Sequence, residues 1–238
     1  MANGASIQVC KTCGASGSGK YCSACGQPFV QKRITAREML HDVFHFFTHL
    51  DKGFGFTLKS LITQPGTMQR TFVEGDRARH QKPFSMFFIC ATILAVSRYW
   101  LNQTLVHYYH VGLTQEANFF HQYMVMVQIV MMPVYSFIVF LFFRNTRYNY
   151  GELLVLMLYT VGLLFLIVSV IQLLKFIWPN MDTAPIELPV LMVYNIITFV
   201  HFFNESPRWV VVVKSILVLL ITFLISHYLE KGLIHLLY

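Results

Sequence analysis

Residues 153–178 read LLVLMLYTVGLLFLIVSVIQLLKFIW, and this stretch decides the fold class. Its single charged side chain, Lys175, stands close to its end. A helix needs roughly 17–25 predominantly apolar residues to cross the hydrocarbon core of a bilayer. We therefore expect a membrane-spanning helix here.

Four other stretches have a similar apolar character. They cover residues 84–101, 120–143, 188–203 and 209–229. The stretch at 188–203 is short, which leaves open whether it spans or re-enters beside the last one. Pro133 is expected to break the helix that contains it. The sequence predicts an all-α integral membrane protein whose bundle of about five transmembrane helices occupies residues 84–238.

Composition divides the chain into two parts. Of its 238 residues 55% are hydrophobic and only 12% are charged, whereas soluble domains average about 25% charged residues. Residues 1–82 carry eleven of the eighteen Lys and Arg. A basic N-terminal region therefore precedes an integral membrane region.

The loops between the apolar stretches predict the orientation. Arg144, Arg147 and Arg208 lie in the two loops on the side of the N-terminus, while residues 102–119 and 179–187 contain no Lys or Arg. Loops rich in Lys and Arg stay in the cytoplasm. We expect a cytoplasmic N-terminus and, with five spans, a C-terminus on the other side.

The N-terminal segment CKTCGASGSGKYCSACGQ, residues 10–27, contains two CxxC pairs. This spacing suits tetrahedral Zn²⁺ bound by four thiolates, which leaves no open position for catalysis. The predicted ligands are Cys10, Cys13, Cys22 and Cys25. A disulfide or redox pair is the alternative, and a reducing cytoplasm disfavours it. We expect residues 1–30 to form a structural zinc ribbon or knuckle that needs its metal to fold.

The basic residues around these cysteines also raise the question of nucleic-acid binding. Positive charges next to a first span are what cytoplasmic orientation and anionic lipid headgroups require. We therefore expect no nucleic-acid partner, and favour contact with a protein or capping of the bundle.

Residues 31–83 are predicted to form cytosolic or interfacial helices. The first carries a wide apolar stripe, typical of a helix at the membrane surface. His41, His45 and His49 recur every four residues on one face of it. These histidines are candidates for a second metal site or a pH-sensitive face. The alternative is the polar edge of an interfacial helix.

Shorter helices should follow before the first span. Gly53 and Gly55 are expected to break the first helix. A second helix capped by Thr57 should end near Thr63, and a third should cover residues 67–73. Four residues then stand at the expected bilayer surface as candidate contacts for headgroups or for an interface: Arg77, Arg79, His80 and Lys82. Glu74 and Asp76 are expected to pair with these arginines.

The combined motifs over residues 10–84 resemble DUF3667, a bacterial family of unknown function. The matching residues are Cys10, Cys13, Cys22, Cys25, Gly26, Gln27, Arg33, Thr35, Asp51, Gly53, Thr57, Leu58, Pro65, Gly66, Gly75, Arg77 and Pro83. The resemblance implies an N-terminal zinc knuckle followed by several membrane helices. It implies no activity. The expected location is the bacterial inner membrane.

Polar residues inside spans are the default candidates for function, and here they are few. Gln128, Gln172 and Asn195 form the predicted intramembrane polar set. Glu152 is expected to pair with Arg144 and Arg147. No catalytic residue is assigned, because motifs for nucleotide binding or hydrolysis do not occur in the sequence.

These observations favour a non-enzymatic membrane protein whose knuckle and interfacial helices form a docking or sensing module. Membrane lipids and a protein partner are the expected contacts, and the chain is a candidate homo-oligomer. A transporter or channel component is the first alternative. A lipid-active enzyme using Asp76, Arg77 and His80 is the second.

Overall fold

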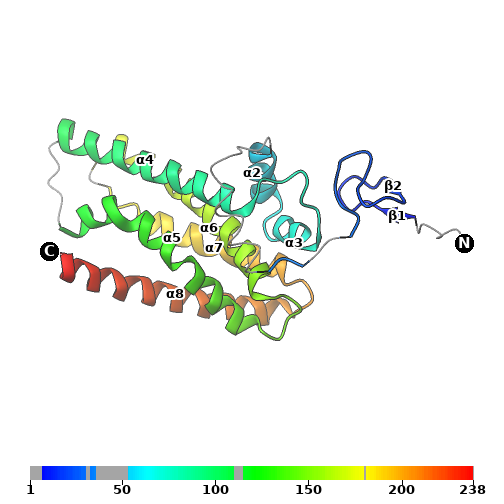
Figure 1. Cartoon of the computed structure of the whole chain (residues 1–238). Coiled ribbons are helices and arrows are strands. Elements are labelled where there is room, and N and C mark those ends of the chain that lie inside the picture. Colours follow the sequence, from blue (N-terminus) through cyan, green and yellow to red (C-terminus); the bar gives the residue numbers. More distant parts are fainter. Residues whose placement is uncertain (1–6, 31–32, 36–52, 110–114, 180, 238) are drawn as a thin grey trace, which may run out of the picture.

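The computed structural model describes residues 7–30, 33–35, 53–109, 115–179 and 181–237. The predicted interfacial helix with His41, His45 and His49 lies outside these residues. Two short paired strands, β1 (Gln8–Val9) and β2 (Ser16–Gly17), belong to the N-terminal region. The remaining regular structure is helical, as the sequence predicts (Figure 1).

Within the described residues, five helices are long and apolar enough to cross a membrane. They are α4 (Pro83–Tyr109), α5 (Gln115–Phe143), α6 (Tyr150–Gln172), α7 (Ala184–Phe202) and α8 (Arg208–Leu237). A short 3-10 helix, η2 (Leu173–Phe176), extends α6. The uncertain stretch at 188–203 is therefore part of a helix of spanning length.

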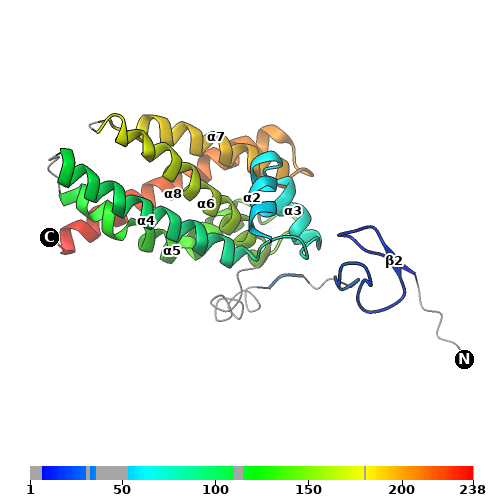
Figure 2. The same ribbon diagram turned by 90° about the horizontal axis from the view of Figure 1, so that it is seen from above.

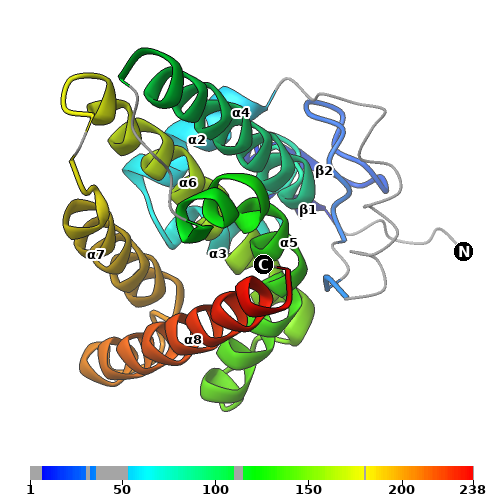
Figure 3. The same ribbon diagram turned by 90° about the vertical axis from the view of Figure 1, so that its left-hand side faces the viewer.

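Helix α6 forms the centre of the bundle. The most apolar stretch of α6 is 67% buried, whereas the corresponding stretches of the other four long helices are 39% buried or less. It contacts α4, α5 and α7, and Figure 3 shows it between them. At Gly162 a Cβ atom would lie 3.3 Å from the Cα of Phe87, so this glycine lets α4 approach closely. The stretch that predicts the fold class thus also builds the core.

Proline does not interrupt α5 as expected. Helix α5 runs through Pro133 to Phe143 without a break. Proline costs one backbone hydrogen bond, and neighbouring helices in a membrane bundle tolerate that cost. The prediction that Pro133 breaks this helix is therefore wrong.

Two short helices lie at one end of the bundle. They are α2 (Phe54–Thr63) and α3 (Thr67–Glu74), and both contact α6. Helix α3 is followed by Gly75, whose φ of 125° suits glycine. Helix α2 contradicts the predicted boundary, because it begins three residues before Thr57 and includes Gly55. The amide of Thr57 already bonds to Gly53 O at 2.9 Å, so this residue is inside the helix and not its cap.

The N-terminal region lies at the same end as α2 and α3, and the C-terminus lies at the opposite end (Figures 1 and 2). Ile34 fastens the connecting chain, because its buried side chain belongs to the hydrophobic core of the bundle. An odd number of spans between the two termini accounts for this separation.

Candidate metal centre and the loop that it contacts

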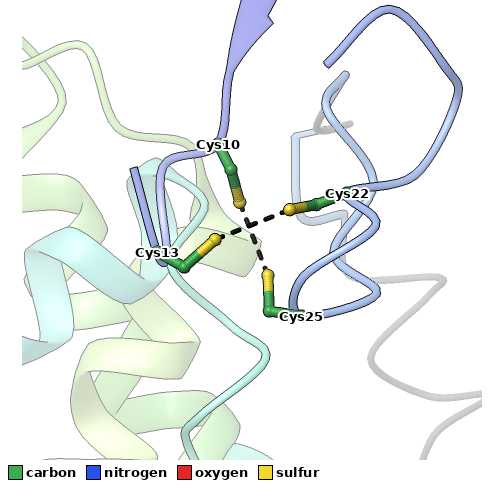
Figure 4. Close-up of side chains that lie close together, drawn as sticks. All are labelled: Cys10, Cys13, Cys22 and Cys25. Carbon is green, nitrogen blue, oxygen red and sulfur yellow. Dashed lines mark hydrogen bonds between the residues drawn. The ribbon is translucent and has the colours of Figure 1, made fainter. Parts of the chain in front are cut away.

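The four cysteines converge on one point. Each CxxC pair folds into the same turn: Gly14 N bonds to Cys10 O at 2.9 Å, and Gly26 N bonds to Cys22 O at 2.8 Å. Both glycines have a positive φ, 76° and 74°, a conformation that residues with a Cβ rarely adopt. Figure 4 shows the four side chains pointing toward a common centre.

Distances between the sulfur atoms fit a metal ion. The Sγ atoms all lie within 4.8 Å of one another, and the pairs Cys10–Cys25 and Cys13–Cys22 are each 3.5 Å apart. A tetrahedral zinc ion with Zn–S bonds of about 2.3 Å places its ligands about 3.8 Å from one another. A disulfide needs about 2.05 Å, and all four cysteines are free. The cluster can therefore hold a metal ion.

Electrostatics around the thiols divide them into two kinds. The backbone amide of Cys13 favours the Cys10 thiolate and lowers the pKa of this thiol to about 6. For Cys25 the backbone of Gln27 acts in the same direction, but burial and the three other thiols outweigh it and raise its pKa to about 12. Four thiols this close cannot all ionise without a cation among them. A bound metal supplies that charge and displaces the remaining protons.

The knuckle, residues 10–27, is fixed to the loop that joins α3 to α4, residues 75–82, which we call the α3–α4 loop. Gln27 is 4% exposed; its amide nitrogen donates to Gly75 O, and its amide oxygen accepts from Ala78 N at 2.8 Å. Arg79 donates to Thr12 O at 2.6 Å, inside the first CxxC pair. Lys11 donates to Glu74 O at 2.8 Å. Both halves of the knuckle thus bind the same loop.

The other side of the α3–α4 loop is bound to the bundle. Gln81 N donates to the hydroxyl of Thr57 at 2.8 Å, and the hydroxyl of Tyr159 donates to Gln81 O. Gly53 allows this approach, since a Cβ there would lie 2.8 Å from Arg79 O. The loop is therefore clamped between the knuckle and α6.

The candidate headgroup residues Arg77, Arg79 and His80 are held by contacts within the protein. Arg79 pairs with Asp76 at 3.3 Å as well as with Thr12. Arg77 donates to Phe72 O at 3.3 Å, below the loop. His80 is half-buried against Phe56 and Phe72, and this burial lowers its pKa. Lys82 is exposed immediately before α4.

The ion pair of Glu152 differs from the expected one. This buried carboxylate accepts two hydrogen bonds from Arg33, at 3.0 and 2.8 Å, rather than pairing with Arg144 or Arg147. Glu152 also completes the cap of α6 with Asn149. Arg147 turns outward to Glu74 and Glu205. Arg33 reaches Glu152 because Ile34 inserts into the core beside it.

The three predicted intramembrane polar residues do not share a site. Gln172 contacts Arg98 and Glu187 at the end of the bundle away from the knuckle. Asn195 is buried in α7. Gln128 lies on α5 beside Tyr135, whose hydroxyl contacts that of Ser226 on α8 at 2.6 Å. Gln172 thus joins polar groups of α4 and α7, whereas Gln128 lies beside a separate polar contact between α5 and α8.

Comparison with known proteins bears on the clamped loop. Residues 51–95 match the family model described as "Protein of unknown function (DUF3667)". The resemblance is confirmed. The matched segment contains α2, α3, the α3–α4 loop and the first part of α4. Neither a curated protein nor a solved structure gave a significant match.

Sequence reasoning assigned no role to Gln27 or Arg33. Gln27 stands two residues after the last cysteine of the second CxxC pair, and a polar side chain so close to the metal ligands is a signal for a contact. Its partners are main-chain atoms of residues 75 and 78, which side-chain patterns do not reveal. Arg33 and Glu152 lie 119 positions apart, and their pairing depends on the tertiary fold.

Proposed function

We propose that this chain is a non-enzymatic, multi-pass membrane protein whose zinc-folded knuckle is a docking module for a protein partner. Zinc is the metal that a closed set of four thiolates suits best. The family match carries no activity, so the proposal rests on how the knuckle is mounted and on what it exposes.

The observation that carries the proposal is that the knuckle region is held to the bundle by some of its residues and exposes large apolar side chains at others. Gln27 and Thr12 contact the α3–α4 loop, and Lys11 contacts the end of α3, as described above. Four large apolar side chains are left in solvent: Ile7, Val9, Tyr21 and Val30 are 77%, 64%, 66% and 74% exposed. Several exposed large apolar side chains on so small a unit favour contact with a protein.

The hydrogen bonds that hold the knuckle to the bundle favour binding at such a surface. A metal-folded unit held by hydrogen bonds presents its side chains in one arrangement, so binding costs less conformational entropy. Removal of the metal unfolds a unit that has little apolar interior of its own. Docking is therefore expected to depend on metal.

Photo-crosslinking in native membranes tests the proposal. A photoreactive phenylalanine analogue in place of Tyr21 is expected to give a discrete protein adduct. The adduct should disappear in the background of Cys22→Ser while the helices remain inserted. The same analogue at exposed Tyr99 on α4 is the control, because that side chain lies at the far end of the bundle. The docking function is contradicted if the analogue at position 21 gives no protein adduct, or if the adduct also forms in the Cys22→Ser background.

A further inference from the structure

A charged side chain faces the interior of the bundle at the end away from the knuckle. Arg98 lies within α4, and its Nε donates to Gln172 Oε1 of α6 at 3.3 Å. Gln172 Nε2 in turn donates to Glu187 Oε1 of α7 at 3.3 Å. A charged residue within a membrane helix is costly, pairs with others and marks function by default. We call Arg98, Gln172 and Glu187 the polar relay.

The relay leaves part of the guanidinium without a partner. Arg98 Nη1 is buried and has no hydrogen-bond partner in the described part of the chain. Asn102 Oδ1, four residues further along α4, is buried and unpaired in the same sense. Residues four apart share one face of a helix. Two polar groups that each lack a bond therefore lie on one face of α4.

Their chemistry favours an anionic ligand. The oxygen and nitrogen of an asparagine amide are assigned by the hydrogen bonds they make, so either end of the Asn102 amide can face a ligand. With its nitrogen inward, Asn102 donates beside Arg98 Nη1. Guanidinium and amide donors together suit the oxygens of a phosphate group. The Glu187 carboxylate accepts from Gln172 and not from the guanidinium, so it holds Gln172 in the position that orients Arg98.

Aromatic side chains place the relay at the depth of lipid headgroups. Exposed Tyr99 and Trp100 directly follow Arg98, and exposed Trp178 follows η2. Tyrosine and tryptophan concentrate where the hydrocarbon core meets the headgroups. Glu187, in the first turn of α7, lies at the same end. Phosphate groups of phospholipids are found at this level of the bilayer.

We propose that Arg98 and Asn102 bind a phosphate group between α4, α6 and α7. Arg98 Nη1 donates to a phosphate oxygen, Asn102 donates to the same group, and Gln172 and Glu187 are positioning residues. A phospholipid headgroup and free phosphate present the same chemistry to this site. This inference is independent of docking by the knuckle, which lies at the other end.

Lipid titration of the delipidated full-length protein tests the proposal. Native mass spectrometry in detergent would compare phosphatidylethanolamine with diacylglycerol of the same acyl chains. A phosphate site predicts affinity for the phospholipid at least about tenfold above that for diacylglycerol, since a charge-assisted hydrogen bond is lost with the phosphate. Inorganic phosphate distinguishes the two sources. Binding to phosphatidylethanolamine that inorganic phosphate does not displace identifies the headgroup, and displacement at millimolar levels identifies free phosphate.

Substitutions locate the site. R98Q is expected to weaken phospholipid binding about tenfold or more, and R98K to an intermediate degree because lysine lacks the fork of donors. R208Q is the matched control, as exposed Arg208 begins α8 at the opposite end. If R98Q fails to fold, N102A replaces it, with a loss of several-fold expected. Equal affinity of wild type, R98K and N102A for the phospholipid would overturn the proposal, and so would equal binding of phospholipid and diacylglycerol.

Discussion

Gln27 shows how one side chain connects the metal centre to the bundle. Its amide bridges Gly75 O and Ala78 N, so one side chain of the knuckle binds main-chain atoms on both sides of a turn. We expect Gln27→Ala to weaken the contact between knuckle and loop by about 1–3 kcal/mol. Ala78 N loses its partner, and Gly75 O keeps only the bond from Arg77 N. Metal content should not change, since the four thiolates remain.

The measurement for Gln27→Ala is hydrogen exchange of residues 75–82 together with zinc analysis. Gln64→Ala is the control, because Gln64 is an exposed glutamine at the same end of the molecule. Faster exchange in the loop with one zinc retained is the expected result. Unchanged exchange would show that the bridge contributes nothing to the contact.

His80 makes the same loop sensitive to pH. Burial lowers its pKa below the usual 6.5, against the opposing effect of Asp76. The unfolded loop therefore binds the proton more readily, so the packing is fully stable above about pH 6.5 and loses stability as the pH falls below that value. We expect exchange protection factors of residues 75–82 to fall between pH 7 and pH 5. His80→Phe should remove the dependence, and a loop equally sensitive in that variant would assign the effect to another group.

At the scale of elements, the turn between α2 and α3 depends on a glycine. Gly66 has a φ of 78°, and a Cβ there would lie 2.1 Å from Thr198 O of α7. Gly66→Ala should cost at least about 1–3 kcal/mol from the backbone conformation alone, and more from the overlap. In α2, a Cβ at Gly55 meets nothing within 4 Å. Gly55→Ala is therefore expected to be neutral or to stabilise by up to about 1 kcal/mol.

Thermal unfolding of both alanine variants in detergent checks this pair. A lower midpoint for Gly66→Ala with an unchanged or higher one for Gly55→Ala is expected. If both variants unfold like wild type, the turn at Gly66 does not approach Thr198 of α7 as the structure shows.

On the whole-molecule scale, apolar run length predicts the five membrane helices and the cysteine spacing predicts the metal centre, because both are local properties of the chain. The start of α2 and the path through Pro133 were not predictable in this way, since packing overrode the local preference of Gly55 and Pro133. Contacts such as Arg33 with Glu152 depend on how distant segments meet. The polar relay was visible in part: Gln172 was singled out, but its partners Arg98 and Glu187 lie on two other helices.

Five spans require that the two ends of the chain lie on opposite sides of the membrane. The knuckle, α2 and α3 lie at one end of the bundle (Figure 1), where Arg147 pairs with Glu74 and Glu205. Arg144 lies in the same loop as Arg147 and Arg208 begins α8, whereas residues 102–119 and 179–187 carry no Lys or Arg. The positive end is expected to face the cytoplasm.

Protease accessibility of epitope tags tests this orientation. When protease is added to cells whose outer layer has been removed or made permeable while the inner membrane stays intact, a tag at the N-terminus should be protected and a tag at the C-terminus should be cleaved. Lysed cells, in which both tags are accessible, provide the control. Protection of both tags would contradict the five-span topology, because α7 or another helix would then fail to cross. Cleavage of the N-terminal tag alone would keep five spans and reverse the orientation, which would show that the charge at the knuckle end does not set it.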